Sequence, residues 1–266
     1  MNPLDDLSPD YRAILCDIWG VVHDGDRILP GVEARLQRWK GEGRKIILVT
    51  NAPRPAATVQ SHLDRLGLSR NAYDAITSSG EAGIAALTDP PRPVGFLGTH
   101  EDKVDLVQRG VVITAGEFAE LACTGLDEWR DEPDAYRDQL TAWVQAGVVL
   151  HCLNPDRIVI HCGRREACAG ALADIYEELG GQVRWYGKPH PSIYDHARSL
   201  AGNPARDRML AIGDGLPTDM LGAAAYGIDA IYVSHGIHAG ELMPADFASR
   251  HGLPEWRPIM TVESLA

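Results

Sequence analysis

The sequence predicts an α/β protein with a doubly wound, mostly parallel sheet at its core and a second α/β domain inserted into that core. Short apolar runs alternate with segments of helical spacing in the first part of the chain, as in parallel strands joined by crossover helices. The apolar runs at residues 13–18, 45–49 and 209–212 each contain or lead into polar residues. In a parallel sheet the carboxyl ends of the strands form the ligand-binding edge, so we expect the functional site there.

The first part of the chain predicts three strands and two helices. Residues 45–49 (KIILV) are expected to form a buried strand, because four consecutive apolar residues follow Lys45. Residues 31–40 and 55–66 repeat apolar residues at helical spacing, and glycines follow both segments and end them. The expected strands are residues 13–18, 45–49 and 73–77, and the expected helices are residues 31–40 and 55–66.

The middle of the chain predicts a unit of its own, an inserted α/β domain at residues 77–187. The core would then consist of residues 1–76 and 188–266. In the insert we expect strands at residues 94–98, 111–114, 148–152 and 157–161, and helices at residues 103–108, 133–145 and 165–179. The returning core should contain helices at residues 191–200 and 217–226 and strands at residues 209–212 and 229–233, followed by a loop-rich tail.

Composition excludes several classes of protein. An apolar share of 45% in 266 residues is typical of a globular chain rather than a disordered one. A net charge of -12 argues against a nucleic-acid partner, because an acidic surface repels phosphate backbones. The N-terminal segment has no signal-peptide pattern, and no apolar run approaches the roughly 20 residues of a membrane span. We therefore expect a cytoplasmic protein with no membrane partner, and the sequence leaves a homo-oligomer open.

The cysteines support the same compartment. Their number is odd and their spacing irregular, which predicts reduced thiols rather than a disulfide framework. They are Cys16, Cys123, Cys152, Cys162 and Cys168.

Three carboxylates stand at predicted strand ends. Asp17 ends the first apolar run, and Asp214 and Asp219 lie five positions apart in a glycine-rich turn that opens a helix. Oxygen ligands gathered on a turn suit Mg²⁺, which takes one or two carboxylates and keeps several waters. Each aspartate alone could equally be an ordinary turn or helix-capping residue.

Two further positions could bind phosphate. Thr50 and Asn51 end the second strand, where a hydroxyl and backbone N–H groups can meet phosphate oxygens. Lys188 is held between a glycine and a proline and could offset phosphate charge. Taken singly, a helix-entry turn and a solvated loop lysine explain these positions as well.

Together the four segments resemble the motifs of the haloacid dehalogenase (HAD) superfamily, and more narrowly those of its subclass IIA, which includes pyridoxal-phosphate, nucleotide and p-nitrophenyl phosphatases. The resemblance covers nearly the whole chain. DIWGVVHDG is similar to the first motif of the superfamily, VTNAP to the second, GKPHPSIYD to the third and GDGLPTDMLGA to the fourth.

The resemblance implies a role for each core residue. Asp17 would attack phosphorus and form an aspartyl-phosphate. Asp17, Asp214 and the backbone carbonyl of Trp19 would bind Mg²⁺, with Asp219 in or beside the metal shell. A carboxylate nucleophile with a cation nearby fits the general chemistry of phosphoryl transfer.

It also implies how the phosphoryl group and the rest of the substrate are held. Thr50, Asn51 and Lys188 would hold the phosphoryl group. The insert would act as a cap that excludes water, and Asn154 and Asp156 of its LNPD turn would contact the substrate.

One position departs from the pattern. The family's phosphatases usually carry an acid/base aspartate two residues after the nucleophile, and this chain has Trp19 there. Indole cannot exchange a proton at neutral pH, and losing a general acid/base typically lowers a rate about 10²–10⁴-fold. His23 or Asp24 could substitute, the substrate could have a good leaving group such as an acyl phosphate, or the activity could be reduced.

The sequence thus predicts an enzyme, an HAD-type phosphatase that acts with Mg²⁺ on small phosphorylated metabolites such as sugar phosphates, nucleotides or pyridoxal phosphate. A metabolite-binding protein that keeps the Mg²⁺ site is the main alternative, favoured by Trp19. A phosphotransferase or C–P hydrolase ranks lower, because the C–P branch resembles enzymes with a cap lysine and the insert contains only Lys103, on a predicted helix.

Overall fold

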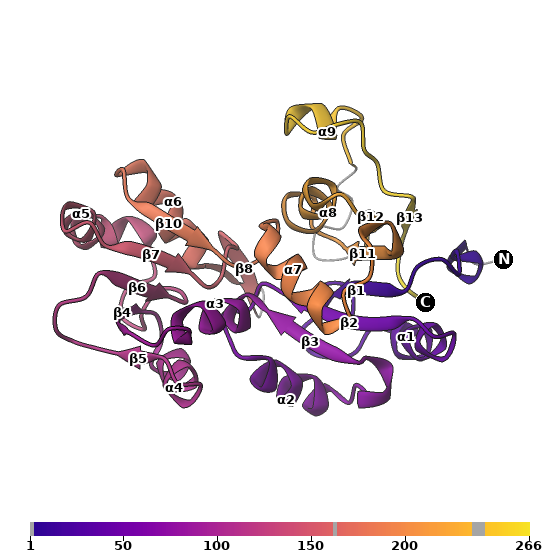
Figure 1. Cartoon of the computed structure of the whole chain (residues 1–266), viewed down its shortest axis with the longest axis horizontal. Helices are drawn as coiled ribbons and strands as arrows, with labels where there is room; N and C mark the ends of the chain where they lie inside the picture. Colours follow the sequence, from indigo (N-terminus) through magenta and orange to yellow (C-terminus); the bar gives the residue numbers. More distant parts are fainter. Residues whose placement is uncertain (1–2, 162–163, 236–242) are drawn as a thin grey trace. The chain divides into compact units, whose positions relative to one another are not determined.

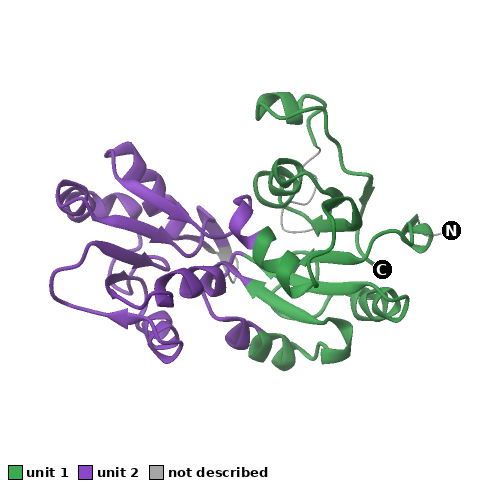
Figure 2. Cartoon of the chain, in the orientation of Figure 1, with its two compact units in different colours: residues 1–50, 60–77, 194–266 green, residues 51–59, 78–193 purple. Residues whose placement is uncertain are grey.

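The structure is a computed structural model that describes residues 3–161, 164–235 and 243–266 (Figure 1). It contains two compact units, which are coloured separately in Figure 2. The first consists of residues 1–50, 60–77 and 194–266, and the second of residues 51–59 and 78–193. The second unit therefore contains residues 51–59 and 188–193 in addition to residues 78–187 of the insert predicted at residues 77–187. The predicted domain boundaries themselves stay a prediction.

The first unit is built on a six-stranded sheet with the order β13-β12-β11-β1-β2-β3. The central strand β1 (Ala13–Asp17) pairs in parallel with β11 (Met209–Gly213) on one side and β2 (Lys45–Thr50) on the other. β12 (Asp229–Val233) and β13 (Met260–Val262) extend the sheet in parallel, and β3 (Ala75–Ser78) forms the opposite edge. All residues of β1 and β11 are buried, as expected of central strands covered on both faces.

Helices connect these strands as the apolar spacing predicts. In α1 (Val32–Gly41) the buried residues Val32, Leu36 and Trp39 recur at helical intervals. Helix α2 (Ala56–Leu66) follows β2, α7 (Pro191–Leu200) precedes β11, and α8 (Leu221–Tyr226) lies between β11 and β12. In the tail, which the sequence predicts to be loop-rich, the described residues form one short helix, α9 (Phe247–Arg250), and the edge strand β13.

The second unit has a five-stranded parallel sheet of its own, with the order β10-β7-β6-β4-β5. Its strands are β4 (Pro93–Leu97), β5 (Val112–Ile113), β6 (Glu120–Cys123), β7 (Val149–Cys152) and β10 (Gln182–Trp185). An antiparallel pair, β8 (Ile158–His161) and β9 (Arg164–Ala167), stands apart from this sheet. The helices are α3 (Ser79–Thr88), α4 (His100–Gln108), α5 (Arg137–Gln145) and α6 (Ala169–Glu178).

Several predicted elements of the insert need correction. The helix expected at residues 165–179 begins only at Ala169, because Arg164–Ala167 pairs with β8 as a strand. Helix α3 and strands β6 and β10 were not predicted. The predicted fold class is nevertheless confirmed, since both main sheets are mostly parallel and have helices between their strands.

Four of the five cysteines lie in the described residues, and all four are buried thiols that form no disulfide there. Cys162 lies outside the described residues. Among the described residues, none of the helices has the length and apolar character needed to cross a membrane.

Candidate functional site

Three buried aspartates meet in the first unit, where β1 and β11 end. Asp17 is the last residue of β1, Asp214 directly follows β11, and Asp219 lies in η5 (Leu216–Met220), a π-helical turn. The parallel register pairs Cys16 with Ile212, so the two strand ends lie side by side. One carboxylate oxygen from each aspartate falls within 4.8 Å of the others, and the residues are only 7%, 4% and 4% exposed.

Two glycines allow Asp219 to reach the other carboxylates. A Cβ atom on Gly213 would lie 2.1 Å from Asp219 Cγ, and one on Gly215 would lie 2.1 Å from Thr218 Oγ1. The Gly215 N–H and the Thr218 hydroxyl both donate to Asp219 Oδ2, at 3.2 and 3.3 Å. The glycines of the GDG segment are thus required because the Asp219 side chain folds back over them.

The carboxylate cluster fits a hard divalent cation. Three carboxylates in a buried space repel one another strongly, since the local dielectric constant is far below that of water. Oxygen ligands from carboxylates are those that Mg²⁺ prefers. Asp17, Asp214 and Asp219 are therefore suited to hold one, as the sequence predicts for Mg²⁺.

The loop after Asp17 brings Trp19 and His23 together. Their rings meet edge to face with centroids 5.1 Å apart, and the residues form a bridge in the backbone. Gly25 has φ near +106°, and a Cβ there would lie 3.0 Å from the Trp19 ring, so the indole packs against the loop backbone. The ring of His62, on α2, lies 5.3 Å from that of His23. Nothing in the sequence pattern singled out His62, because it is one polar residue on an amphipathic helix.

The contacts of the two predicted acid/base residues define their charge states. His23 is 2% exposed, and burial lowers its pKa to about 4, so the ring is neutral at pH 7. Its Nδ1 accepts the Gly25 N–H at 3.0 Å. Asp24 is exposed, and its Oδ1 accepts the N–H groups of Asp26 and Arg27. These hydrogen bonds lower the pKa of Asp24 and keep it ionised.

The second unit contains a separate polar cluster around Lys188, which is 4% exposed. The Asn51 side chain accepts the Lys188 N–H at 2.7 Å and donates to the Lys188 carbonyl at 3.1 Å. It also donates to Asp156 Oδ1 at 2.7 Å. Asn154 Oδ1 accepts the Asp156 N–H at 3.1 Å. The structure thus brings together four predicted site residues, Asn51, Asn154, Asp156 and Lys188.

Thr50 is the remaining predicted phosphate-binding residue. It is the half-buried last residue of β2, next to β1 in the first unit. The register pairs Asp17 with Val49, so Thr50 follows the residue opposite Asp17. The carboxylate cluster belongs to the first unit and the Lys188 cluster to the second.

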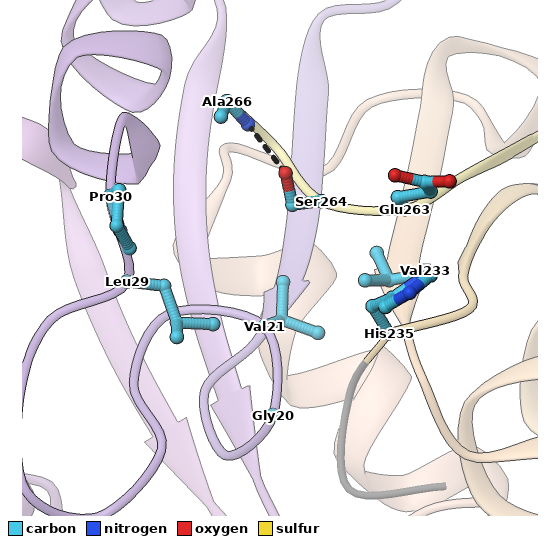
Figure 3. A pocket seen from close by; sticks show the side chains of 9 residues that line it. All are labelled: Gly20, Val21, Leu29, Pro30, Val233, His235, Glu263, Ser264 and Ala266. Carbon is cyan, nitrogen blue, oxygen red and sulfur yellow. Dashed lines mark hydrogen bonds between the residues drawn. The ribbon is translucent and has the colours of Figure 1, made fainter. Parts of the chain in front are cut away.

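A pocket of about 180 Å³ lies elsewhere in the first unit (Figure 3). Gly20 and Val21 of the loop after Asp17 line it, together with Leu29, Pro30, Val233, His235, Glu263, Ser264 and Ala266. Figure 3 shows a mainly apolar lining, and the Ala266 N–H donates to Ser264 Oγ at 3.3 Å. None of the three clustered carboxylates lines this pocket. The carboxylate cluster, rather than the pocket, is therefore the candidate active site.

Comparisons with known proteins decide the family. Two family models match, one described as haloacid dehalogenase-like hydrolase at residues 14–112 and one as HAD-hydrolase-like at residues 185–266. A crystal structure of a haloacid dehalogenase-like hydrolase from Brucella suis superposes with a TM-score of 0.84 at 36% identity, covering 99% of this chain and 98% of that one. The chain belongs to the haloacid dehalogenase-like hydrolases. This confirms the predicted family and hydrolase class.

Curated relatives of this haloacid dehalogenase-like hydrolase are more distant. D-glycerol 3-phosphate phosphatase of Mycobacterium tuberculosis is 25% identical over 88% of this chain, which spans only 65% of that relative. Chronophin of Rattus norvegicus is 25% identical over 99% of this chain and 88% of its own length. A structure of glycerol phosphate phosphatase from Mycobacterium tuberculosis in complex with magnesium has a TM-score of 0.72 at 22% identity, covering 96% of this chain and 76% of that one.

Proposed function

We propose that this haloacid dehalogenase-like hydrolase is a Mg²⁺-dependent phosphatase of small phosphorylated metabolites, acting through an aspartyl-phosphate on Asp17. The observation that carries the proposal is the cluster of Asp17, Asp214 and Asp219, whose oxygens lie within 4.8 Å at the ends of two central strands. The expected substrates are sugar phosphates, nucleotides or pyridoxal phosphate. The name of one curated relative, D-glycerol 3-phosphate phosphatase, supports the reaction type.

In the first unit, Asp17 has a different proposed role from Asp214 and Asp219. One oxygen of Asp17 attacks phosphorus and the bond to the leaving oxygen breaks, which leaves the phosphoryl group on Asp17. Water then releases phosphate from it. Asp214 and Asp219 would hold Mg²⁺ together with Asp17 and the Trp19 carbonyl, and the bound ion would offset charge on the phosphoryl oxygens. Gly213 and Gly215 keep Asp219 in place for this.

Thr50, the backbone N–H of Asn51 and Lys188 are proposed to hold the phosphoryl group. A lysine ammonium offsets the charge of phosphoryl oxygens as a point cation, and a hydroxyl or backbone N–H donates to them. Asn154 and Asp156 of the LNPD turn stay predicted contacts of the inserted domain to the substrate.

Proton transfer is the step that this chain handles differently. Trp19 cannot replace an acid/base aspartate, and Asp24 is held ionised by its N–H contacts, which suits it poorly to donate a proton. His23 is neutral and its lowered pKa makes it a weak base. These contacts favour a substrate whose leaving group needs little protonation, such as an acyl phosphate. The same absence of an acid/base at Trp19 favours the second candidate function, a metabolite-binding protein that keeps the Mg²⁺ site.

The test is phosphate release from a panel of sugar phosphates, nucleotides, pyridoxal phosphate and acetyl phosphate, with Mg²⁺ or with EDTA. We expect Mg²⁺-dependent release that Asp17→Asn abolishes, and the highest rate for acetyl phosphate. Asp10→Asn, an exposed aspartate near the start of the same strand, is the matched control and should keep full activity. No release from any compound, with Mg²⁺-dependent metabolite binding in calorimetry, would favour the binding protein.

A further inference from the structure

We propose that the Asn51 side chain and Asp156 are positioning residues that fix the backbone of Lys188, and that they do not contact the organic part of the substrate. The inference rests on the proposed function, because it assigns Lys188 to the phosphoryl group. It changes the expectation for Asp156, whose turn resembles a substrate-contacting segment. It concerns contacts within the second unit alone.

The hydrogen-bonding capacity of Asn51 is almost fully used. A side-chain amide has two N–H donors and one carbonyl oxygen. One donor goes to Asp156 Oδ1 at 2.7 Å and the other to the Lys188 carbonyl at 3.1 Å, while Oδ1 accepts the Lys188 N–H at 2.7 Å. Asn51 thus pairs with both backbone polar groups of Lys188, much as a neighbouring strand would. Both of its N–H donors are occupied, so its amide has none left for a phosphate oxygen.

Asp156 completes this contact from the LNPD turn. Its carboxylate accepts one Asn51 N–H, which fixes the orientation of the amide and so decides which end faces the Lys188 N–H. The turn itself is held by Asn154, whose Oδ1 accepts the Asp156 N–H. Because the hydrogen bond to a carboxylate is charge-assisted, it is stronger than one between neutral groups.

The two residues before Lys188, Tyr186 and Gly187, are closely packed. A Cβ on Gly187 would lie 2.5 Å from both Asn51 Oδ1 and Pro155 Cγ. On the other side, the Tyr186 hydroxyl lies 2.7 Å from Nδ1 of His151, which is 0% exposed. The segment is therefore fixed before Lys188 by Tyr186 and at Lys188 by Asn51.

Positioning matters here because lysine is flexible. Its ammonium stands at the end of a four-carbon chain, and its place is defined only if the backbone and the stem are held. A displacement of about 1 Å can lower a rate about 10²-fold. We therefore expect Asn51→Ala and Asp156→Ala to act on the reaction through Lys188.

A double-mutant cycle tests this role. We expect Asn51→Ala and Asp156→Ala each to lower kcat/KM roughly 10-fold to 10²-fold, by the same factor for every substrate including acetyl phosphate. Added to Lys188→Met, each should cause almost no further loss, because residues that act as a unit are not additive. Asn71→Ala and Asp134→Ala, at exposed positions, are the matched controls. Losses that multiply with Lys188→Met, or that differ between leaving groups, would show direct substrate contact and overturn the proposal.

A second readout is independent of activity. Hydrogen–deuterium exchange should be roughly tenfold faster at the Lys188 amide in Asn51→Ala, and faster also in Asp156→Ala, because the Lys188 N–H loses or loosens its acceptor. Unchanged exchange at Lys188 in both folded variants would overturn the proposal even if activity fell. If the wild-type protein released no phosphate from any compound, the proposed function would fail. The exchange measurement would still test whether Asn51 and Asp156 fix the backbone of Lys188.

Discussion

Gly213 and Asp219 are in such close contact that a single methyl group on Gly213 would occupy the position of the Asp219 carboxylate. The Cβ position of Gly213 lies only 2.1 Å from Asp219 Cγ. The last residue of β11 therefore controls whether the third carboxylate can join Asp17 and Asp214.

Gly213→Ala should displace Asp219 and weaken the cation site. We expect a loss of about 1–3 kcal/mol in the free energy of unfolding, as for overpacked buried positions. Mg²⁺ affinity, measured by calorimetry, should fall at least about 10-fold, since one oxygen ligand moves away. Gly41→Ala is the control, because nothing lies within 4 Å of its Cβ position at the end of α1. Unchanged Mg²⁺ affinity in Gly213→Ala would remove Asp219 from the site.

Asp214→Asn should have opposite effects on stability with and without Mg²⁺. In EDTA we expect the free energy of unfolding of the variant to exceed that of wild type by about 1–2 kcal/mol, because one of three buried like charges is gone. With Mg²⁺ at 100 times its Kd, wild type should gain about 2.7 kcal/mol and the variant little. Urea unfolding under both conditions measures this. Asp246→Asn, which removes an exposed pair with Arg250, should change neither value. Equal Mg²⁺ stabilisation of both proteins would contradict the proposed cation site.

Trp19→Asp should restore a general acid two residues after Asp17. We expect kcat to rise about 10²-fold for alkyl phosphates, which have poor leaving groups, and to change little for acetyl phosphate. The substitution also removes indole packing against Gly25 and His23, so stability should fall. Trp19→Asn loses the same packing without gaining a proton donor and is the matched control. A similar rate change in both variants would mean that packing, not proton transfer, is responsible.

His151 should make the second unit sensitive to acid. It lies 3.1 Å from Glu120, which pairs with Arg92, and burial lowers the pKa of His151 well below its ordinary value. Since the unfolded chain binds the proton more readily, stability is full above about pH 6.5 and falls as the pH drops toward the lower folded-state pKa. His151→Gln should flatten this decline and cost about 1–2 kcal/mol at pH 7.5 by weakening the Tyr186 contact.

Urea unfolding between pH 4 and pH 8 measures the decline. Burial also lowers the pKa values of His23 and His190 to about 4, so they add to the wild-type slope with the same sign. The difference between His151→Gln and wild type in the pH dependence of the free energy of unfolding gives the contribution of His151. Parallel curves for the two proteins would show that His151 does not titrate on unfolding in this range.

The sequence was most informative about the carboxylate cluster. Asp17 and Asp214 could be predicted as neighbours because both follow short buried runs, and parallel strands align their carboxyl ends. The contact of Asn51 with Asp156 joins residues 105 positions apart and depends on how the LNPD turn packs, which no local pattern encodes. The position of the motifs at strand ends thus predicted which carboxylates meet, whereas the residues that contact the Lys188 backbone required the structure.

The elements that were missed have equally physical reasons. Helix α3 contains Gly80 and Gly83, which lower helix propensity, so its segment did not read as a helix. Gly80 is needed because a Cβ there would lie 2.0 Å from the Pro53 carbonyl oxygen. Arg164–Ala167 has residues common in helices, and only its pairing with β8 makes it a strand. Tertiary contacts outweighed local preference in both segments.

The position of β1 between β2 and β11 also bears on how the protein is made. β2 follows β1 closely in the chain, but β11 begins at residue 209, after the whole inserted part. During synthesis Asp17 can gain its β2 neighbour early, yet Asp214 and Asp219 leave the ribosome only after all of the second unit, which ends at residue 193. We therefore expect cation binding by the three carboxylates only after residue 219 has emerged, and Mg²⁺ affinity of stalled nascent chains would report when β11 and η5 have joined β1.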